Sequence, residues 1–225
     1  MVTSGVLVLP TTPAAYEHLK QSFSCRTVQK TYIALVHGLA PVDGTIDARL
    51  RVVSSVSTRK TFVHPHGKEA RTDFRRLGVY QLPVSETPPG CGPSTVIPVV
   101  LSPGGQAATF AAAATCEQTE HRPLLQPNEH LFSLMEVYPH TGRTHQIRAH
   151  LASINHPLVR DVKYFSQRWQ TVARRRDDRT WCPRVFLHAS RLRLPADLDG
   201  VAVDVQAALT PELEVILASL VEVAA

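Results

Sequence analysis

The chain has 225 residues, of which 44% are hydrophobic and 19% are charged, as is usual for a globular protein with one large domain or two small ones. No apolar run reaches transmembrane length, and no signal-peptide pattern opens the chain. The cysteines lack a CxxC pair, which excludes a zinc ribbon or disulfide scaffold and favours a reducing compartment. A formal net charge of +5 permits a polyanionic partner.

The first part of the chain predicts a short strand followed by a helix. Residues 5–10, GVLVLP, form an apolar run that is typical of a buried strand. Thr12-Pro13 predicts the beginning of a helix, because proline is favoured in a first helical turn. The residues expected on the inner face of this helix are Ala15, Leu19 and Phe23.

Strands dominate the rest of the pattern. Residues 30–38, KTYIALVHG, are apolar on both faces, which predicts a strand in the interior of a sheet. Alternation and turn residues predict further strands at 45–50, 69–80, 130–138, 184–194 and 201–205. Strand meanders of this kind favour an α+β fold with a mixed, largely antiparallel central sheet flanked by helices.

Two segments have a different character. Residues 81–130 cluster Pro, Ser, Thr and Gly, and we interpret them as a surface insertion in a single domain spanning 1–225. The arginine-rich run at 169–181 is diluted by aspartates, which is typical of a solvated loop. Thr210-Pro211 predicts a C-terminal helix whose inward residues are Leu213, Ile216, Leu217 and Leu220.

The stretch His140–Tyr164 predicts an amphipathic helix rich in histidine and arginine. Ile147, Leu151 and Ile154 form one apolar stripe. Thr141 is a candidate N-cap, and Asn155 before His156-Pro157 marks the expected exit.

The positive charge at the start of this helix is unusual. Arg143 and Arg148 lie in or beside the first two turns, where the helix dipole disfavours cations. We therefore expect a nearby anion, either a carboxylate of the chain itself or a phosphate. The alternative is a pair of solvated arginines on a surface helix.

Other common site chemistries find little support in the sequence. The histidines of this stretch are five or six residues apart, whereas two zinc ligands on one helix face need i, i+4 spacing. We expect no metal site, and a histidine-dependent metal hydrolase is the remotest alternative. The chain also lacks GxSxG, GxGxxG and Walker-type sequences.

A series of blocks, in order, resembles the RluA-type pseudouridine synthases. The strongest block is TGRTHQIRAHL at 141–151, which continues with HPL at 156–158 and with Asp161. The other blocks are TSGVLVL at 3–9, KTYIALVHG at 30–38, GKEARTDF at 67–74 and LHA at 187–189. The blocks span nearly the whole chain apart from 81–130.

The resemblance implies the pseudouridine synthase catalytic fold and an enzyme that isomerises uridine in rRNA or tRNA to pseudouridine, without metal or organic cofactor. An aspartate attacks the flipped nucleotide, the glycosidic bond breaks, and carbon 5 of the turned uracil rejoins the ribose. RNA is the implied partner, and we expect a monomer without membrane attachment. The implied catalytic residues are Tyr32 against the base, Arg148 paired with the aspartate, and Leu187 lining the uracil pocket. The implied RNA-binding residues are Lys30, Arg143, Thr144, His145 and Gln146.

The resemblance places the nucleophile outside the sequence. The family's first block reads Arg-Leu-Asp, two variable residues and Thr-Ser-Gly, and Met1-Val2 occupy the variable positions. We expect the chain as written to be inactive, through either a misassigned start, which we favour, or descent to a non-catalytic RNA-binding relative. Asn155 and Arg160 stand where the family has glycine; asparagine tolerates the left-handed backbone conformation, and Arg160 is expected to alter the loop or contact a phosphate.

Overall fold

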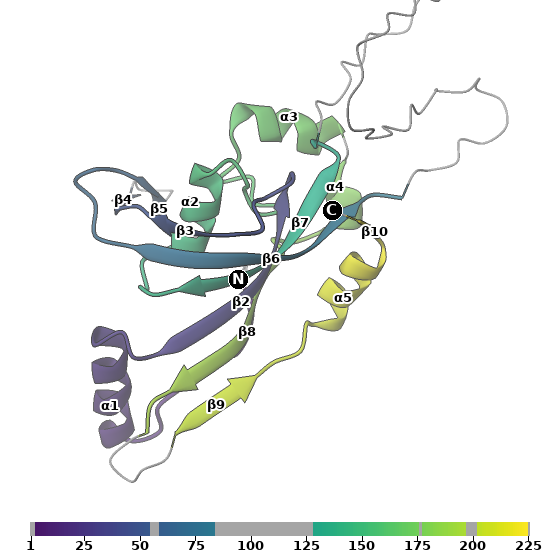
Figure 1. Cartoon of the computed structure of the whole chain (residues 1–225). Helices are drawn as coiled ribbons and strands as arrows, with labels where there is room; N and C mark the ends of the chain where they lie inside the picture. Colours follow the sequence, from purple (N-terminus) through teal and green to yellow (C-terminus); the bar gives the residue numbers. More distant parts are fainter. Residues whose placement is uncertain (1–2, 55–58, 84–127, 176, 197–201, 225) are drawn as a thin grey trace, which may run out of the picture. The chain divides into compact units, whose positions relative to one another are not determined.

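A central sheet of eight strands organises the part of the chain that the computed structural model describes, residues 3–54, 59–83, 128–175, 177–196 and 202–224 (Figure 1). Its strands are β1 (Ser4–Gly5), β2 (Gln29–His37), β3 (Asp43–Asp47), β6 (Arg71–Gln81), β7 (Leu131–Pro139), β8 (Leu187–Leu194), β9 (Val203–Gln206) and β10 (Val221–Val223). The order is β1-β8-β2-β7-β6-β10, with β3 paired to β6 and β9 paired to β8. Of these pairings only β1–β8 is parallel.

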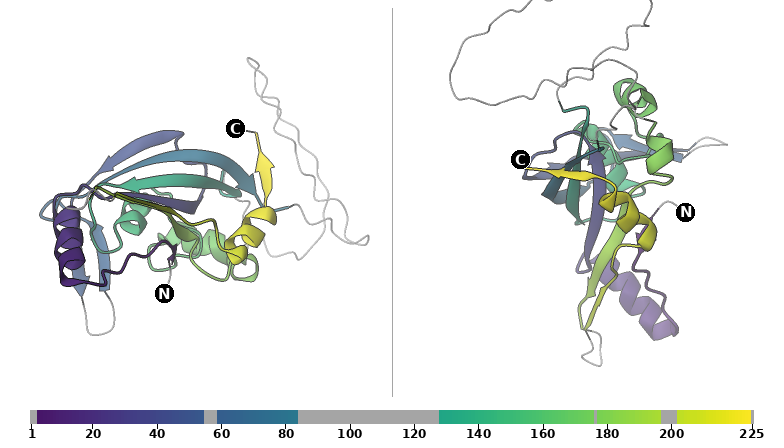
Figure 2. Two further views of the ribbon diagram at one scale, coloured as in Figure 1. Left: turned by 90° about the horizontal axis from the view of Figure 1, so that it is seen from below. Right: turned by 90° about the vertical axis from the view of Figure 1, so that its right-hand side faces the viewer.

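A separate hairpin and five helices complete the described elements. The hairpin consists of β4 (Leu50–Ser54) and β5 (Arg59–Val63), which pair with each other in a two-stranded sheet of their own. The helices are α1 (Pro13–Ser24), α2 (Gln146–Ser153), α3 (Gln167–Arg175), α4 (Asp178–Trp181) and α5 (Pro211–Ala218). The predicted α+β fold class with a largely antiparallel sheet is therefore confirmed. Figure 2 shows the sheet from two further directions, with β10 beside the end of β6.

The central strand β2 is an interior strand, as its two apolar faces predict. It pairs antiparallel with β7 on one side and with β8 on the other. Ala34, Leu35 and Val36 are all 0% exposed. Because side chains alternate along a strand, Ala34 and Val36 face one hydrophobic cluster and Leu35 faces a second on the opposite side of the sheet.

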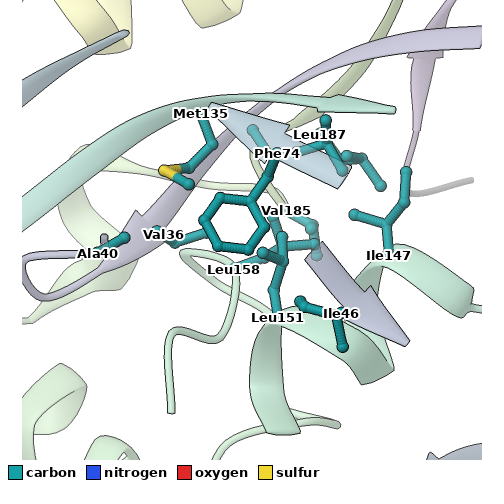
Figure 3. Packing of buried hydrophobic residues seen from close by; sticks show 12 residues of the cluster. Val36, Ala40, Ile46, Phe74, Met135, Ile147, Leu151, Leu158, Val185 and Leu187 are labelled. Atoms are coloured by element: carbon teal, nitrogen blue, oxygen red, sulfur yellow. The ribbon is translucent and has the colours of Figure 1, made fainter. Parts of the chain in front are cut away.

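The first cluster packs α2 against the sheet. Ile147 and Leu151 are buried in it with Phe74 and Leu187, and Ile154 packs against its edge. The predicted apolar stripe of this helix is thus confirmed. Figure 3 shows that Ile147 and Leu187 belong to the same packed group, so the cluster extends from the centre of the sheet to the first turn of α2.

The second cluster packs α5 against the other face. Leu213 and Ile216 of this helix and Leu220 after it are buried with Leu35. The helix begins at Pro211 after the N-cap Thr210, as predicted.

The N-terminal expectations are only partly correct. Thr12 does cap α1, since its hydroxyl accepts a hydrogen bond of 3.1 Å from the Ala15 backbone N–H. The buried strand over 5–10 is wrong: only Ser4–Gly5 pairs with β8, and Leu7 and Leu9 are more than 70% exposed. The chain leaves the sheet at Gly5, whose φ of +108° favours glycine and whose Cα lies against the Ala189 backbone.

Two further expectations concern helical faces and loops. Phe23 is 46% exposed, so α1 does not bury the inner face predicted for it; Ser22 is its buried residue. The arginine-rich run at 169–181 is not a loop, because α3 and α4 cover most of it. Trp169 and Val172 anchor α3, each 2% exposed, and their burial outweighs the polarity of the surrounding sequence.

Residues 84–127, which make up most of the segment 81–130, lie outside the described residues. The interpretation of this segment as a surface insertion therefore stays a prediction. The described residues on either side of it belong to one compact unit. None of the helices within the described ranges has the length and apolar character needed to cross a membrane.

Candidate active site at the start of helix α2

The loop before α2 is held by backbone groups and one side chain of β6. Thr141 is not the N-cap; that position belongs to His145, whose φ is 52°. The Thr141 hydroxyl instead donates to Oε1 of Gln146 at 2.6 Å, and the Gln146 amide donates to the Arg71 carbonyl and the Thr72 hydroxyl. Gln146 is 4% exposed, so it acts as a buried support of the loop.

Arg148 has a carboxylate partner inside the chain. Its Nε and Nη2 each donate to a carboxylate oxygen of Asp161 at 2.6 Å. The side chains are 9% and 1% exposed, so this is a buried bidentate ion pair. The anion expected near the arginines is therefore present in the sequence. The resemblance implies the family's catalytic aspartate as the partner of Arg148, whereas Asp161 is the carboxylate that binds it in this structure.

A pocket of about 440 Å³, here called the α2 pocket, opens beside this loop. Strands β2 and β8 supply Lys30, Tyr32 and Leu187, and the start of α2 supplies a cationic wall. It gathers all the predicted site residues except Thr144. The described residues lining it are Thr3, Phe23, Lys30, Tyr32, Pro139, Thr141, Gly142, Arg143, His145, Gln146, Ile147, Arg148 and Leu187.

The pocket combines an apolar floor with polar walls. Ile147 and Leu187 belong to the first hydrophobic cluster and give the floor its rigidity (Figure 3). Burial lowers the pKa of Lys30, whose Nζ donates to the Thr141 carbonyl at 3.3 Å. Burial raises the pKa of Tyr32, so its phenol stays protonated at neutral pH.

A second hollow of about 460 Å³, here called the hairpin groove, adjoins the α2 pocket and shares Gly142 and Arg143 with it. The hairpin supplies Arg51 and Arg59, and Lys68 also lines the groove. Thr144 lines this groove rather than the pocket. Among the described residues that line the groove there is no carboxylate, so its charge is uniformly positive.

The four histidines of the motif region point to separate partners. His140 lies 2.6 Å from an Asp73 carboxylate oxygen, and His145 lies 3.0 Å from the Tyr164 hydroxyl. His150 contacts the Thr72 hydroxyl and the Ala48 carbonyl, while His156 contacts the His37 carbonyl. Each ring therefore has its own structural environment.

Two residues of the site escaped the sequence interpretation as functional positions. Asp161 follows the motif block at 141–158, and the resemblance implies no role for it. Tyr164 ends the motif stretch, and its hydroxyl contacts His145 and the Thr61 backbone N–H. Their position just after the motif helix is the one feature of the sequence that points to them. Their contacts depend on a loop that turns back toward α2.

Known proteins with similar sequences point in one direction. The family model described as RNA pseudouridylate synthase matches residues 2–153. The chain is 28% identical over 206 residues to tRNA pseudouridine synthase C of Pectobacterium carotovorum subsp. carotovorum, covering 91% of this chain and 44% of that protein. It is 30% identical over 214 residues to an uncharacterised RNA pseudouridine synthase of Mycobacterium bovis, covering 94% of this chain and 51% of that one. The chain thus spans about half the length of these relatives.

The fold is also shared with solved structures. Human RNA pseudouridylate synthase domain containing 1 superposes with a TM-score of 0.59 at 21% identity, over 94% of this chain and 66% of that one. Human RNA pseudouridylate synthase domain containing 4 gives a TM-score of 0.58 at 19% identity, over 96% and 71%. With the family model matching well over half of its residues, this chain belongs to the RNA pseudouridylate synthase family.

Proposed function

We propose that the chain forms the catalytic pocket of an RNA pseudouridine synthase that isomerises uridine to pseudouridine in tRNA or rRNA. The observation that carries the proposal is the composition of the α2 pocket. It brings Lys30, Tyr32, Arg148 and Leu187, which are distant in sequence, to one cavity of about 440 Å³. That volume lies in the range of small-ligand sites, roughly 300–1,000 Å³.

The pocket suits a nucleotide that has left its stack. A flipped base loses its stacking neighbours and needs aromatic and aliphatic side chains to replace them. Tyr32 on β2 provides a half-buried aromatic ring, and Leu187 with Ile147 provides aliphatic surface. Because the Tyr32 phenol is protonated at neutral pH, it holds the base by packing; accepting the proton from carbon 5 would first require its own proton to leave.

Arg148 is the residue that would orient the nucleophile. Asp161 occupies its Nε and Nη2, while Nη1 has no partner among the described residues. A second carboxylate beside Nη1 would be kept ionised by the guanidinium. In the family pattern the aspartate stands two variable residues before the Thr-Ser-Gly block. Thr3, the first described residue, lines the α2 pocket.

RNA would approach along the hairpin groove. Arg51, Arg59 and Lys68 give this groove the positive charge that phosphate contacts require. Arg143 lies between groove and pocket, where it would reach the phosphate beside the bound nucleotide; Thr144 would face the same strand. The relatives named as tRNA pseudouridine synthases favour tRNA as the substrate. We also propose that the protein acts as a monomer and without a cofactor.

The test measures the carbon 5 hydrogen of uridine. Isomerisation joins carbon 5 to the ribose and frees this hydrogen to water, so tRNA or rRNA labelled with tritium at carbon 5 releases tritium only if the reaction occurs. The chain would be assayed as given and preceded by Arg-Leu-Asp, with Arg-Leu-Asn as the matched control. We expect release only from the Arg-Leu-Asp form, abolished by Arg148→Met. No release from that form on either RNA, with RNA bound, would contradict the proposal.

A further inference from the structure

Tyr164 joins the β4–β5 hairpin to the α2 pocket. Tyr164 is 7% exposed and packs with Leu50 and Ala149. Its hydroxyl accepts a hydrogen bond of 3.0 Å from the Thr61 backbone N–H on β5 and lies 3.0 Å from Nδ1 of His145. One buried hydroxyl therefore contacts both the hairpin and the N-terminus of α2.

Hydrogen-bond accounting sets the direction of the contact between Tyr164 and His145. A phenol has a single proton to donate, and the Thr61 N–H already occupies one acceptor position of the oxygen. If the Tyr164 hydroxyl donates to Nδ1, the hydroxyl proton and Nδ1 are both paired. In the reverse direction, with Nδ1–H donating, the hydroxyl proton would have only the Thr61 hydroxyl near it, and Thr61 Oγ1 is not in hydrogen-bonding geometry with any described group, which is unfavourable for a buried donor. The ring proton of His145 is thereby placed on Nε2.

The charges around His145 favour the same state. Burial lowers its pKa below the ordinary value of 6.5, and the nearby cations of Arg148, Lys163 and Arg59 act in the same direction. Asp161 acts in the opposite direction, but it is already bound to Arg148. The imidazole is therefore neutral at neutral pH, with one donor and one acceptor nitrogen.

The backbone also supports a role for this side chain in the pocket. His145 is the N-cap of α2, yet its side chain makes no capping hydrogen bond. Its φ of 52° and ψ of 28° lie in the left-handed region that residues other than glycine rarely adopt. Strained backbone of this kind is common at functional sites. Here it accompanies a ring that lines the α2 pocket while Nδ1 is turned to Tyr164.

We propose that Tyr164 fixes His145 as the neutral Nε2–H tautomer, and that this N–H donates a hydrogen bond to a carbonyl oxygen of the base held in the α2 pocket. Lys30, Arg143 and Arg148 already supply charge for anionic groups, whereas an uncharged donor matches an uncharged oxygen. Tyr164 is the positioning residue. The contact to the base rests on the proposed function; the tautomer does not.

The tautomer is tested by nitrogen NMR of the histidine rings in the 225-residue chain. We expect a protonated Nε2 and an unprotonated Nδ1 for His145. In Tyr164→Phe the hydrogen bond to the neutral ring is lost, so the pKa of His145 should rise by up to about one unit. Tyr138→Phe removes a hydroxyl that contacts Glu136 instead and should leave this titration unchanged. A protonated Nδ1, or a fall in the pKa of His145 in Tyr164→Phe, would overturn the assignment.

The base contact is tested by binding to two short RNAs that differ only in whether the target nucleotide carries uracil or is abasic. His145→Asn keeps a residue that tolerates the left-handed backbone and removes the Nε2 donor. We expect it to bind the uridine RNA about threefold to tenfold more weakly and the abasic RNA unchanged. His140→Asn is the control, since His140 contacts Asp73 and does not line the pocket.

Two other outcomes are informative. Equal losses on both RNAs would overturn the base contact in favour of a backbone contact. If the unmodified chain bound neither RNA, the proposed function and the base contact would fail together, while the NMR result would still decide the tautomer.

Discussion

Asp161 holds Arg148, which lies thirteen residues before it in the chain, through two hydrogen bonds of 2.6 Å, and both side chains are largely buried. The guanidinium also lies 4.9 Å from the centre of the Tyr164 ring. These contacts fix the direction of the arginine at the wall of the α2 pocket. A cation fixed in this way needs no rearrangement to meet a substrate or a catalytic carboxylate.

This ion pair should be important for stability. Asp161→Ala leaves a buried positive charge without a partner, which costs about 3–5 kcal/mol of unfolding free energy. Urea denaturation would measure the loss. Glu17→Ala breaks the exposed pair with Lys20 and should cost about 1 kcal/mol at most. Similar losses in the two variants would show that burial does not matter here.

Arg160 should be a site where glycine stabilises the protein. Its φ is 67°, and its Nε is buried without a hydrogen-bond partner in the described part of the chain. Arg160→Gly should therefore raise the unfolding free energy by about 0.5–1 kcal/mol, after the greater entropy of unfolded glycine is allowed for. The midpoint of thermal unfolding measures the change.

Asn155→Gly is the matched control for Arg160→Gly. Asn155 has a similar φ of 66°, but its side chain accepts a hydrogen bond from Nε1 of Trp169 at 3.1 Å. Asparagine also tolerates this backbone region. We expect no gain in stability. If Arg160→Gly lowered the unfolding free energy, or changed it only as Asn155→Gly does, the arginine side chain would be shown to stabilise its loop.

Stability should fall as the pH drops from 7 toward 5. The pKa values of His145, His150 and His156 are lowered in the folded protein, chiefly by burial. The unfolded chain, with histidine pKa values of about 6.5, then takes up protons first, so acid favours unfolding. Carboxylates such as Asp204, with a pKa of about 2, lose their contribution only at much lower pH.

One histidine offers a direct check of this pH dependence. Nδ1 of His156 lies 2.9 Å from the His37 carbonyl, a contact that the amide of asparagine can reproduce. His156→Asn removes the titrating group, so its urea midpoint should fall less between pH 7 and pH 5 than that of the unmodified chain. A midpoint that rose with acid would contradict the expected sign.

The hairpin groove should contribute to RNA affinity through phosphate contacts. Arg51→Ala and Arg59→Ala should each weaken binding of single-stranded RNA and reduce the slope of log Kd against log salt by about 0.7. Fluorescence anisotropy at several salt concentrations gives the slope. Lys20→Ala, on the exposed face of α1, should leave it unchanged. Equal effects of all three changes would indicate only a general dependence on net charge.

Local patterns in the sequence were enough to predict much of the fold. The Thr12-Pro13 and Thr210-Pro211 pairs placed two helix starts, and apolar residues on both faces of 30–38 placed an interior strand. The stripe of Ile147, Leu151 and Ile154 identified the face of α2 that packs on the sheet. Such features depend on neighbours within one turn or one strand, so they can be inferred from the sequence alone.

The tertiary structure decided which side chains are exposed and which hydrogen-bond partners they have. Leu7 and Leu9 look like core residues in sequence, but the chain leaves the sheet at Gly5 and exposes them. Thr141 has the chemistry of an N-cap, yet Gln146 and the Arg71 backbone engage its hydroxyl instead. A hydrogen-bond partner that is distant in the sequence cannot be predicted from the pattern of neighbouring residues.

The sequence by itself determined the candidate site residues: Tyr32, Arg148, Leu187 and the basic residues around them, which stand in the motif blocks. Only the tertiary structure decided which groups they contact. It gave Arg148 its carboxylate in Asp161, and it placed Tyr164 between His145 and Thr61, which lies 103 residues from Tyr164. The physical reason is that charge pairing and hydrogen-bond direction depend on distances of about 3 Å between side chains, which chain folding alone sets.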